Sequence, residues 1–191
     1  YALDVCDDEG VRYKEPKLKI VGLEAIKSST PAACRVALKE AIQIIIRGSE
    51  DELQTHIDKF RGEFNKMSFE DIASPRGVQG MKEYTLNSKS IPIHVRGSLL
   101  FNKLLQDKKL LKKYNLIKDN EKIKFCYLKQ PNPYHNNAIA FISNLPKEVE
   151  LQEYIDYDVQ FDKAFLEPLK TILNCINWRT EKVASLEAFF T

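Results

Sequence analysis

Residues 16–31 have the sequence Pro-Lys-Leu-Lys-Ile-Val-Gly-Leu-Glu-Ala-Ile-Lys-Ser-Ser-Thr-Pro, which combines three patterns. Residues 17–21 alternate charged and branched side chains with a period of two, which predicts a half-buried strand. Gly22 permits a turn or a close approach of the backbone to a neighbour. Thr30 then stands where a helix N-cap is expected, and Pro31 takes the first helical position. The stretch therefore predicts a strand, a turn and a helix in succession.

The end of the same stretch carries groups that suit phosphate oxygens. Lys27 is followed by three hydroxyl residues, Ser28, Ser29 and Thr30, directly before the predicted helix. Ammonium groups, hydroxyls and the free backbone amides of a helix N-terminus all favour anions. The alternative is an ordinary capped helix preceded by solvated lysines, and these residues alone leave both interpretations open.

Composition limits the class of protein. The chain has 191 residues, 43% hydrophobic and 29% charged, which is enough to bury a substantial core. No apolar run approaches the roughly 18 residues of a membrane span, so no membrane association is predicted. Four scattered cysteines without Cys-x-x-Cys spacing predict reduced, separately buried thiols in a cytoplasmic protein. Because the three histidines are equally scattered, no metal site is predicted.

Charge is distributed unevenly along the chain. Residues 72–130 carry thirteen Lys or Arg against four Asp or Glu, residues 145–170 carry three against seven, and residues 1–71 carry eleven against fourteen. A basic middle between acidic flanks is expected if one face meets a polyanion. The alternative is a solvated, lysine-rich helix, since residues 103–113 hold much of the positive charge.

Periodicity and turn signals predict an α+β fold. Helical spacing indicates helices over residues 31–46, 49–64, 92–105 and 158–176, the last kinked at Pro168, with Cys175 facing inward. Residues 2–6 and 11–14 flank a turn and predict a hairpin, to which residues 17–21 add a third strand. Alternation over residues 121–128 and the apolar run 138–142 predict two more strands that pair.

Two further segments combine a cation with small residues. Residues 72–80 predict a surface loop in which Ser74, Arg76 and Gly77 let the backbone approach a phosphate. His94, Arg96 and Gly97 stand in the first turn of the next predicted helix, where free amides favour anions. An ordinary surface loop is the alternative for the first segment.

The last residues, 184–191, have the sequence Ala-Ser-Leu-Glu-Ala-Phe-Phe-Thr. A single helical turn would bring Leu186, Phe189 and Phe190 to one side. Three large apolar side chains at a chain end favour either a hydrophobic groove on a partner protein or packing against the chain's own domain.

Taken in order, these segments resemble the C-terminal part of the replicative family B DNA polymerases of T-even-type bacteriophages. Tyr1 matches the tyrosine that closes the Lys-Lys-x-Tyr motif at the junction of the palm and thumb domains, although both lysines are missing here. Residues 16–31 are similar to the segment that leads from palm to thumb. Residues 72–84, 92–102, 119–128 and 154–157 resemble successive thumb segments. The series covers the whole chain and predicts a fragment of a longer protein.

The resemblance implies a mostly helical thumb domain with a small antiparallel β-subdomain over residues 23–182. Residues 1–22 would be a β-hairpin remnant of the palm, and residues 183–191 a tail peptide that binds the phage sliding clamp through Leu186, Phe189 and Phe190. The expected partners are primer–template duplex DNA, the clamp and other replisome proteins, in the cytoplasm of the infected bacterial host. The expected DNA contacts are Tyr1, Lys17, Lys19, Lys27, Ser28, Ser29, Thr30, Ser74, Arg76, Gly77, His94, Arg96 and Gly97.

The resemblance also implies an intact enzyme that extends primed DNA and has a 3′–5′ proofreading exonuclease. Catalysis in the family depends on palm aspartates that hold two Mg²⁺ ions and on separate carboxylates of the exonuclease domain. None of those motifs lies in these 191 residues, so the expectation is an inactive fragment with no catalytic residue and no cofactor of its own. The rival class is a protein-interaction module without affinity for DNA, in which the tail supplies the binding.

Overall fold

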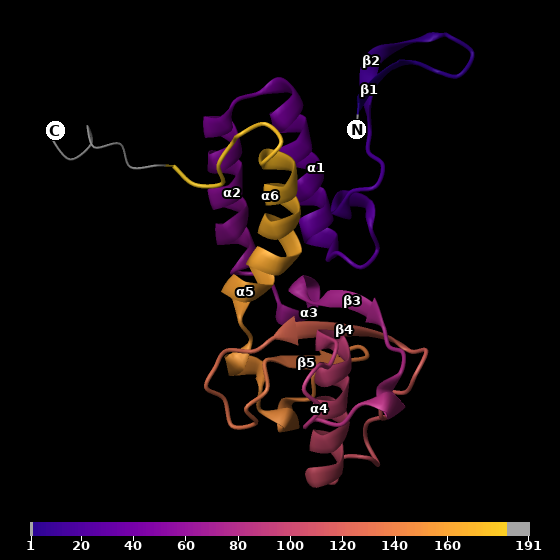
Figure 1. Cartoon of the computed structure of the whole chain (residues 1–191), viewed down its shortest axis with the longest axis vertical. Coiled ribbons are helices and arrows are strands. Elements are labelled where there is room, and N and C mark those ends of the chain that lie inside the picture. Colours follow the sequence, from indigo (N-terminus) through magenta and orange to yellow (C-terminus); the bar gives the residue numbers. More distant parts are fainter. Residues whose placement is uncertain (1, 183–191) are drawn as a thin grey trace, which may run out of the picture.

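The computed structural model describes residues 2–182, together with their side chains except at residues 2–5 and 15–18. The predicted α+β class is confirmed (Figure 1). A helical lobe consists of α1 (Ala32–Arg47), α2 (Glu50–Phe64), α5 (Tyr157–Phe161), η5 (Asp162–Leu166) and α6 (Glu167–Leu173). A sheet lobe consists of β3 (Ser74–Gly77), β4 (Lys122–Tyr127), β5 (Ala138–Phe141) and α4 (Ile93–Asp107). One continuous cluster of buried apolar side chains runs through both lobes.

Shorter helical elements lie between these strands and helices. They are η1 (Glu24–Ile26), α3 (Phe69–Ile72), η2 (Met81–Glu83), η3 (Lys147–Val149) and η4 (Gln152–Tyr154). No helix within residues 2–182 has the length and apolar character needed to cross a membrane.

The helical lobe begins and ends its helices largely as local sequence predicts. Ser49 and Glu52 form the expected capping box, in which each side chain accepts a hydrogen bond from the other residue's backbone N–H at 3.3 Å. The predicted N-cap at Thr30 is wrong, because α1 starts at Ala32 and its N-cap residue is Pro31. The Thr30 hydroxyl instead donates to Glu24 Oε2 at 3.2 Å, and Thr30 is buried.

The long helix predicted over residues 158–176 runs from residue 157 to residue 173 and contains a π-helical segment. Regular α-helix gives way to the π-helix η5, which ends directly before α6, where Pro168 lies in the first turn. Because proline lacks the N–H that an α-helix requires, a widened turn before it keeps the helix continuous. Cys175 lies beyond the helix and is exposed, so its predicted inward orientation is wrong.

The sheet lobe is built on an antiparallel sheet with the strand order β3-β4-β5, in which Ser74 pairs with Phe125 and Phe125 with Ala140. The two strands predicted near residues 121–128 and 138–142 are confirmed, but residues 74–77 form a strand where a loop was predicted. Pro75 argued against a strand here, because proline has no N–H to donate to a β-ladder. On an edge strand, a proline nitrogen can point away from the ladder without losing a bond.

Helix α4 packs on one face of this sheet and comes closest at Gly97. A Cβ atom at Gly97 would lie 2.8 Å from the backbone nitrogen of Ala140 and 2.9 Å from the carbonyl carbon of Ile139. The helix therefore sits directly against β5 because residue 97 has no side chain.

The N-terminal hairpin has two strands rather than the three predicted. The predicted turn is present, since Asp7 Oδ1 accepts from the N–H groups of Glu9 and Val11 at 3.0 and 2.8 Å. After it, β2 (Arg12–Lys19) runs without a break and pairs with β1 (Ala2–Cys6). Each strand of a two-stranded ribbon has an open edge, so Pro16 need not interrupt β2. The hairpin projects away from both lobes (Figure 1).

The four cysteines fall into two classes. Cys34 and Cys126 are buried, and burial raises the pKa of each thiol to about 12, so both stay protonated and inert at neutral pH. Cys6 and Cys175 are exposed. The prediction that all four would be buried is therefore wrong for two of them, because their positions in a projecting hairpin and beyond a helix end offer no core.

Candidate nucleic-acid interface

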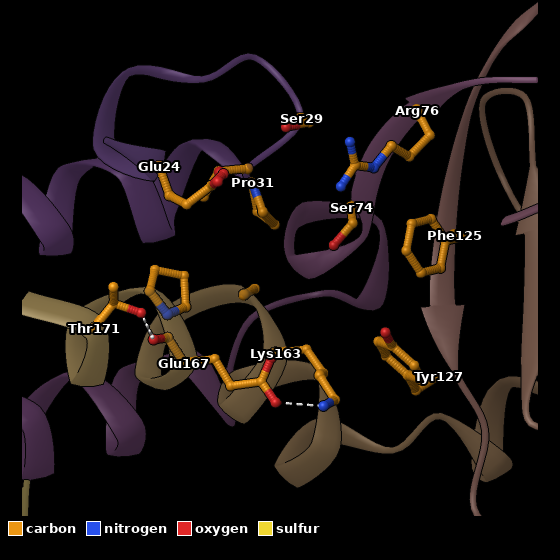
Figure 2. Close-up of a pocket in the computed structure, with 13 residues that line it drawn as sticks. Glu24, Ser29, Pro31, Ser74, Arg76, Phe125, Tyr127, Lys163, Glu167 and Thr171 are labelled. Atoms are coloured by element: carbon orange, nitrogen blue, oxygen red, sulfur yellow. Dashed lines mark hydrogen bonds and ion pairs between the residues drawn. The ribbon is translucent and has the colours of Figure 1, made fainter. Parts of the chain in front are cut away.

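A groove with a volume of about 410 Å³ lies where the two lobes meet. Its lining consists of Glu24, Ser29, Thr30, Pro31, Ser74, Arg76, Phe125, Tyr127, Lys163, Ala164, Glu167, Pro168 and Thr171. Three segments contribute, namely the loop before α1, the β3–β4 side of the sheet, and η5 with α6. In Figure 2, Arg76, Ser74, Phe125 and Tyr127 approach from the sheet, opposite Ser29 and Pro31, with Lys163 and Glu167 below.

The groove brings together two sets of candidate phosphate ligands that lie in separate segments of the sequence. Ser29 and Thr30 come from the stretch before α1, whereas Ser74 and Arg76 come from β3. The Arg76 side chain is exposed and has no hydrogen-bond or ion-pair partner among the residues that the structure describes. A free guanidinium beside hydroxyl groups is suited to an oxyanion such as a phosphate.

Other cations at the groove already have partners. The Glu24 carboxylate accepts hydrogen bonds from Lys27 Nζ at 2.6 Å and from the Thr30 hydroxyl. Two of the predicted phosphate ligands are therefore already paired with Glu24. Lys163 forms an ion pair with Glu167, one turn along the same helix. Two carboxylates and three basic side chains therefore share this region, which makes Arg76 the main source of free positive charge.

Aromatic side chains form the sheet wall of the groove. Phe125 packs against Tyr127 with ring centroids 5.8 Å apart, and His94 from α4 lies 6.4 Å from Phe125. Burial, reinforced by the positive charge of Arg76, lowers the pKa of His94 below its usual 6.5. His94 is therefore neutral at pH 7 and adds no charge to the interface. Burial also raises the pKa of Tyr127, which keeps its phenol protonated.

The groove lining does not include six other predicted DNA contacts, namely Lys27, Ser28, Gly77, His94, Arg96 and Gly97. Arg96 Nη1 donates to Asn137 Oδ1 at 3.1 Å, and Gly97 is buried against β5. Gly77 is exposed at the end of β3 and Ser28 in the loop before α1. Lys17 and Lys19 belong to β2 of the projecting hairpin. Tyr1 and the predicted clamp-binding residues Leu186, Phe189 and Phe190 lie outside the described residues.

The basic middle and the acidic flank of the sequence pair with each other on the surface of the sheet lobe. Lys108 forms an ion pair with Glu150 at 2.7 Å, and Lys113 with Glu148 at 2.5 Å. Lys103 pairs with Asp107 at 2.8 Å within α4. These contacts favour the interpretation of residues 103–113 as a largely solvated and compensated surface.

Several groove residues are not predicted as site residues by the sequence, namely Glu24, Phe125, Tyr127, Lys163 and Glu167. The alternation of residues 121–128 marked Phe125 and Tyr127 as one face of a strand, but it gave no sign that this face is partly open. Lys163 and Glu167 have the i, i+4 spacing of a helix-surface pair, which is common on solvated helices. Within residues 2–182, no three His, Cys, Asp or Glu side chains come together so as to hold a metal ion.

The chain is similar over its whole length to two curated phage proteins, each described as a DNA-directed DNA polymerase. It is 34% identical over 202 residues to the protein of Escherichia phage RB69 and 31% identical over 197 residues to that of Enterobacteria phage T4. Each match covers 100% of the chain but 22% of the relative, so the chain spans about a fifth of the length of these polymerases. No protein-family model matches it. The chain is thus similar, from end to end, to a segment of two phage proteins described as DNA-directed DNA polymerases.

Proposed function

We propose that the chain is the C-terminal, thumb-containing part of a replicative phage DNA polymerase and that it grips primer–template duplex through the sugar-phosphate backbone. The observation that carries the proposal is the similarity, along the entire chain, to two proteins described as DNA-directed DNA polymerases. Residues 1–22 would belong to the edge of the palm, residues 23–182 to the thumb and residues 183–191 to a clamp-binding tail. The projecting hairpin is compatible with a strand pair that packs elsewhere in the intact enzyme.

The groove supports the part of this proposal that concerns DNA. Its free guanidinium and its hydroxyls come from both lobes, so a phosphate bound there would contact the loop before α1 and strand β3 together. Such contacts hold the backbone of a duplex and carry no information about base sequence. The intact enzyme would add nucleotides to a primer and proofread with a 3′–5′ exonuclease, in the cytoplasm of the infected host. Carboxylates outside this chain would hold its Mg²⁺, and the chain alone would be catalytically inactive.

Replacing Arg76 by alanine is expected to weaken binding of a primer–template duplex by about three- to tenfold, because a charge-assisted phosphate contact is lost. The loss should be the same for duplexes of different sequence, and the slope of log K against log salt concentration should flatten by about 1. Titration of a labelled duplex at two salt concentrations measures both quantities.

Arg47→Ala is the matched control, since Arg47 is exposed in the last turn of α1 and does not line the groove. It removes the same charge and should change duplex affinity by less than about twofold. Equal effects of the two substitutions would mean that net charge, rather than the groove, governs binding.

Replacing Phe189 and Phe190 together by alanine is expected to abolish capture of the chain by the phage sliding clamp. Large aromatic side chains act as anchors when they fill a hydrophobic pocket of a partner, and their removal leaves little binding. Surface plasmon resonance with immobilised clamp measures the effect, and unchanged duplex affinity serves as the control. Full retention of capture would move the clamp contact to another surface.

The rival function, a protein-interaction module without DNA affinity, predicts clamp capture together with an absence of salt-dependent duplex binding. The same titration separates the two functions. The polar lining of the groove and its unpaired arginine favour the DNA-binding alternative.

A further inference from the structure

Gln160 is a fully buried polar residue in α5, and its carboxamide is bonded to the wall of the groove. Its Nε2 donates to the carbonyl oxygen of Ile72 at 2.8 Å and to the Ser74 hydroxyl at 3.0 Å. Its Oε1 accepts from the backbone N–H of Tyr127 at 3.2 Å. The Gln160 carboxamide, which belongs to the helical lobe, thus makes two donor bonds and one acceptor bond to residues at the sheet.

The strand register explains what this carboxamide replaces. Ser74 lies opposite Phe125 in the β3–β4 ladder, so a continuation of β3 would place Ile72 opposite Tyr127. Val78 N–H donates to Glu121 O beyond the other end of the strand. Because hydrogen-bonded pairs alternate along an antiparallel ladder, Ile72 and Tyr127 would form the next such pair. Gln160 stands between the Ile72 carbonyl and the Tyr127 N–H and completes this rung in place of a direct bond.

The neighbouring backbone contacts follow the same pattern. The carbonyl oxygen of Tyr127 accepts from Asp156 N–H at 2.9 Å, and the Ile72 N–H is taken by Ser68 O of the α3 turn. The start of α5 therefore occupies the edge of β4 just beyond the first residue of β3. Ser74 and Tyr127, which flank the inserted carboxamide, both line the groove.

We infer that Gln160 is a positioning residue for duplex binding, which holds Ile72, two residues before β3, apart from β4 and thereby sets Ser74 and Arg76 across the groove from Ser29. This inference rests on the proposed function, because it assigns Gln160 an effect on DNA through Arg76. An apolar side chain at position 160 would leave the buried Ile72 carbonyl and the Tyr127 N–H without partners. The edge strand would then shift to satisfy them, and Arg76 would move with it.

A double-mutant cycle on the 191-residue chain tests the inference, with a labelled primer–template duplex as the probe. Gln160→Leu is expected to weaken binding by about fivefold in the otherwise unaltered chain and by less than about twofold when Arg76→Ala is already present. Such non-additivity is not produced by a loss of stability alone, because a smaller folded fraction would weaken binding equally in both backgrounds. Gln160→Met, of similar length and flexibility, provides a second and milder variant.

Gln54→Leu is the matched control. Gln54 is also a buried helical glutamine, and its Nε2 donates to the carbonyls of Arg179 and Glu181, at a site that shares no residue with the groove. It should change duplex affinity by less than about twofold in folded protein. Circular dichroism and chemical denaturation establish the folded fraction of every variant.

The outcomes separate the inference from the proposed function. Duplex binding that depends on Arg76, combined with additive effects of Gln160 and Arg76, would overturn the positioning role and leave the proposed function intact. Absence of duplex binding by the unaltered chain at low salt would overturn both. Failure of both Gln160 variants to fold would assign the residue to stability and overturn its positioning role.

Discussion

Replacing Phe161 by alanine is expected to lower the free energy of unfolding by about 3–5 kcal/mol. Phe161 is fully buried at the end of α5, and its ring centroid lies 5.2 Å from those of both Phe64 and Phe165. The Arg61 guanidinium lies 4.5 Å from the same centroid. Removal of the ring therefore deletes contacts to α2 and η5 together and leaves a cavity that a packed core does not refill.

The loss would be a large share of the stability of the chain, since domains of this size unfold with about 5–15 kcal/mol. Chemical denaturation followed by circular dichroism measures the change in the midpoint. Val159→Ala is the control in the same helix, because Val159 is 37% exposed and should cost less than about 1 kcal/mol. Similar losses for both substitutions would contradict the central place of the aromatic cluster.

Replacing Gly97 by alanine is expected to destabilise the chain by about 1–3 kcal/mol, although alanine is the better helix former. The new methyl group would lie 2.8 Å from Ala140 N, a backbone atom that cannot rotate away. Helix α4 would have to move off β5, which opens the packing between them. The change in unfolding free energy under denaturant measures this effect.

Gly62→Ala provides a control of opposite sign. Gly62 lies in α2, and a Cβ atom there would meet nothing within 4 Å. The same substitution should therefore stabilise the chain by about 0.5–1 kcal/mol through the lower entropy of the unfolded state. A loss of duplex affinity without any loss of stability in Gly97→Ala would instead favour the direct DNA contact predicted from the sequence.

Features encoded by neighbours in the sequence were predicted correctly. The capping box of Ser49 and Glu52, the turn at Asp7 and the alternation of β4 each depend on residues only a few positions apart. Local backbone geometry and side-chain periodicity suffice for such features, and together they predicted the α+β class.

Features that depend on distant partners were predicted poorly. Residues 74–77 form a strand because β4 supplies a ladder from 45 or more residues away, an outcome that Pro75 argued against in the sequence. A nearby partner was missed as well, since Lys27 and Thr30 suit phosphate in isolation but both donate to the Glu24 carboxylate a few residues before them. Gly97 has the sequence context of an anion site and is instead a packing contact.

The sequence by itself determined the helices, most of the strands, the resemblance to phage polymerases and the identity of Arg76 as a candidate phosphate ligand. The tertiary structure alone decided that Arg76 and Ser29 share one groove, that Lys108 and Lys113 pair with the acidic residues Glu150 and Glu148, and that Gln160 completes a rung between β3 and β4. The physical reason is that propensity and periodicity act over a few residues. The pairing of a polar group, in contrast, depends on which distant segment folding brings against it.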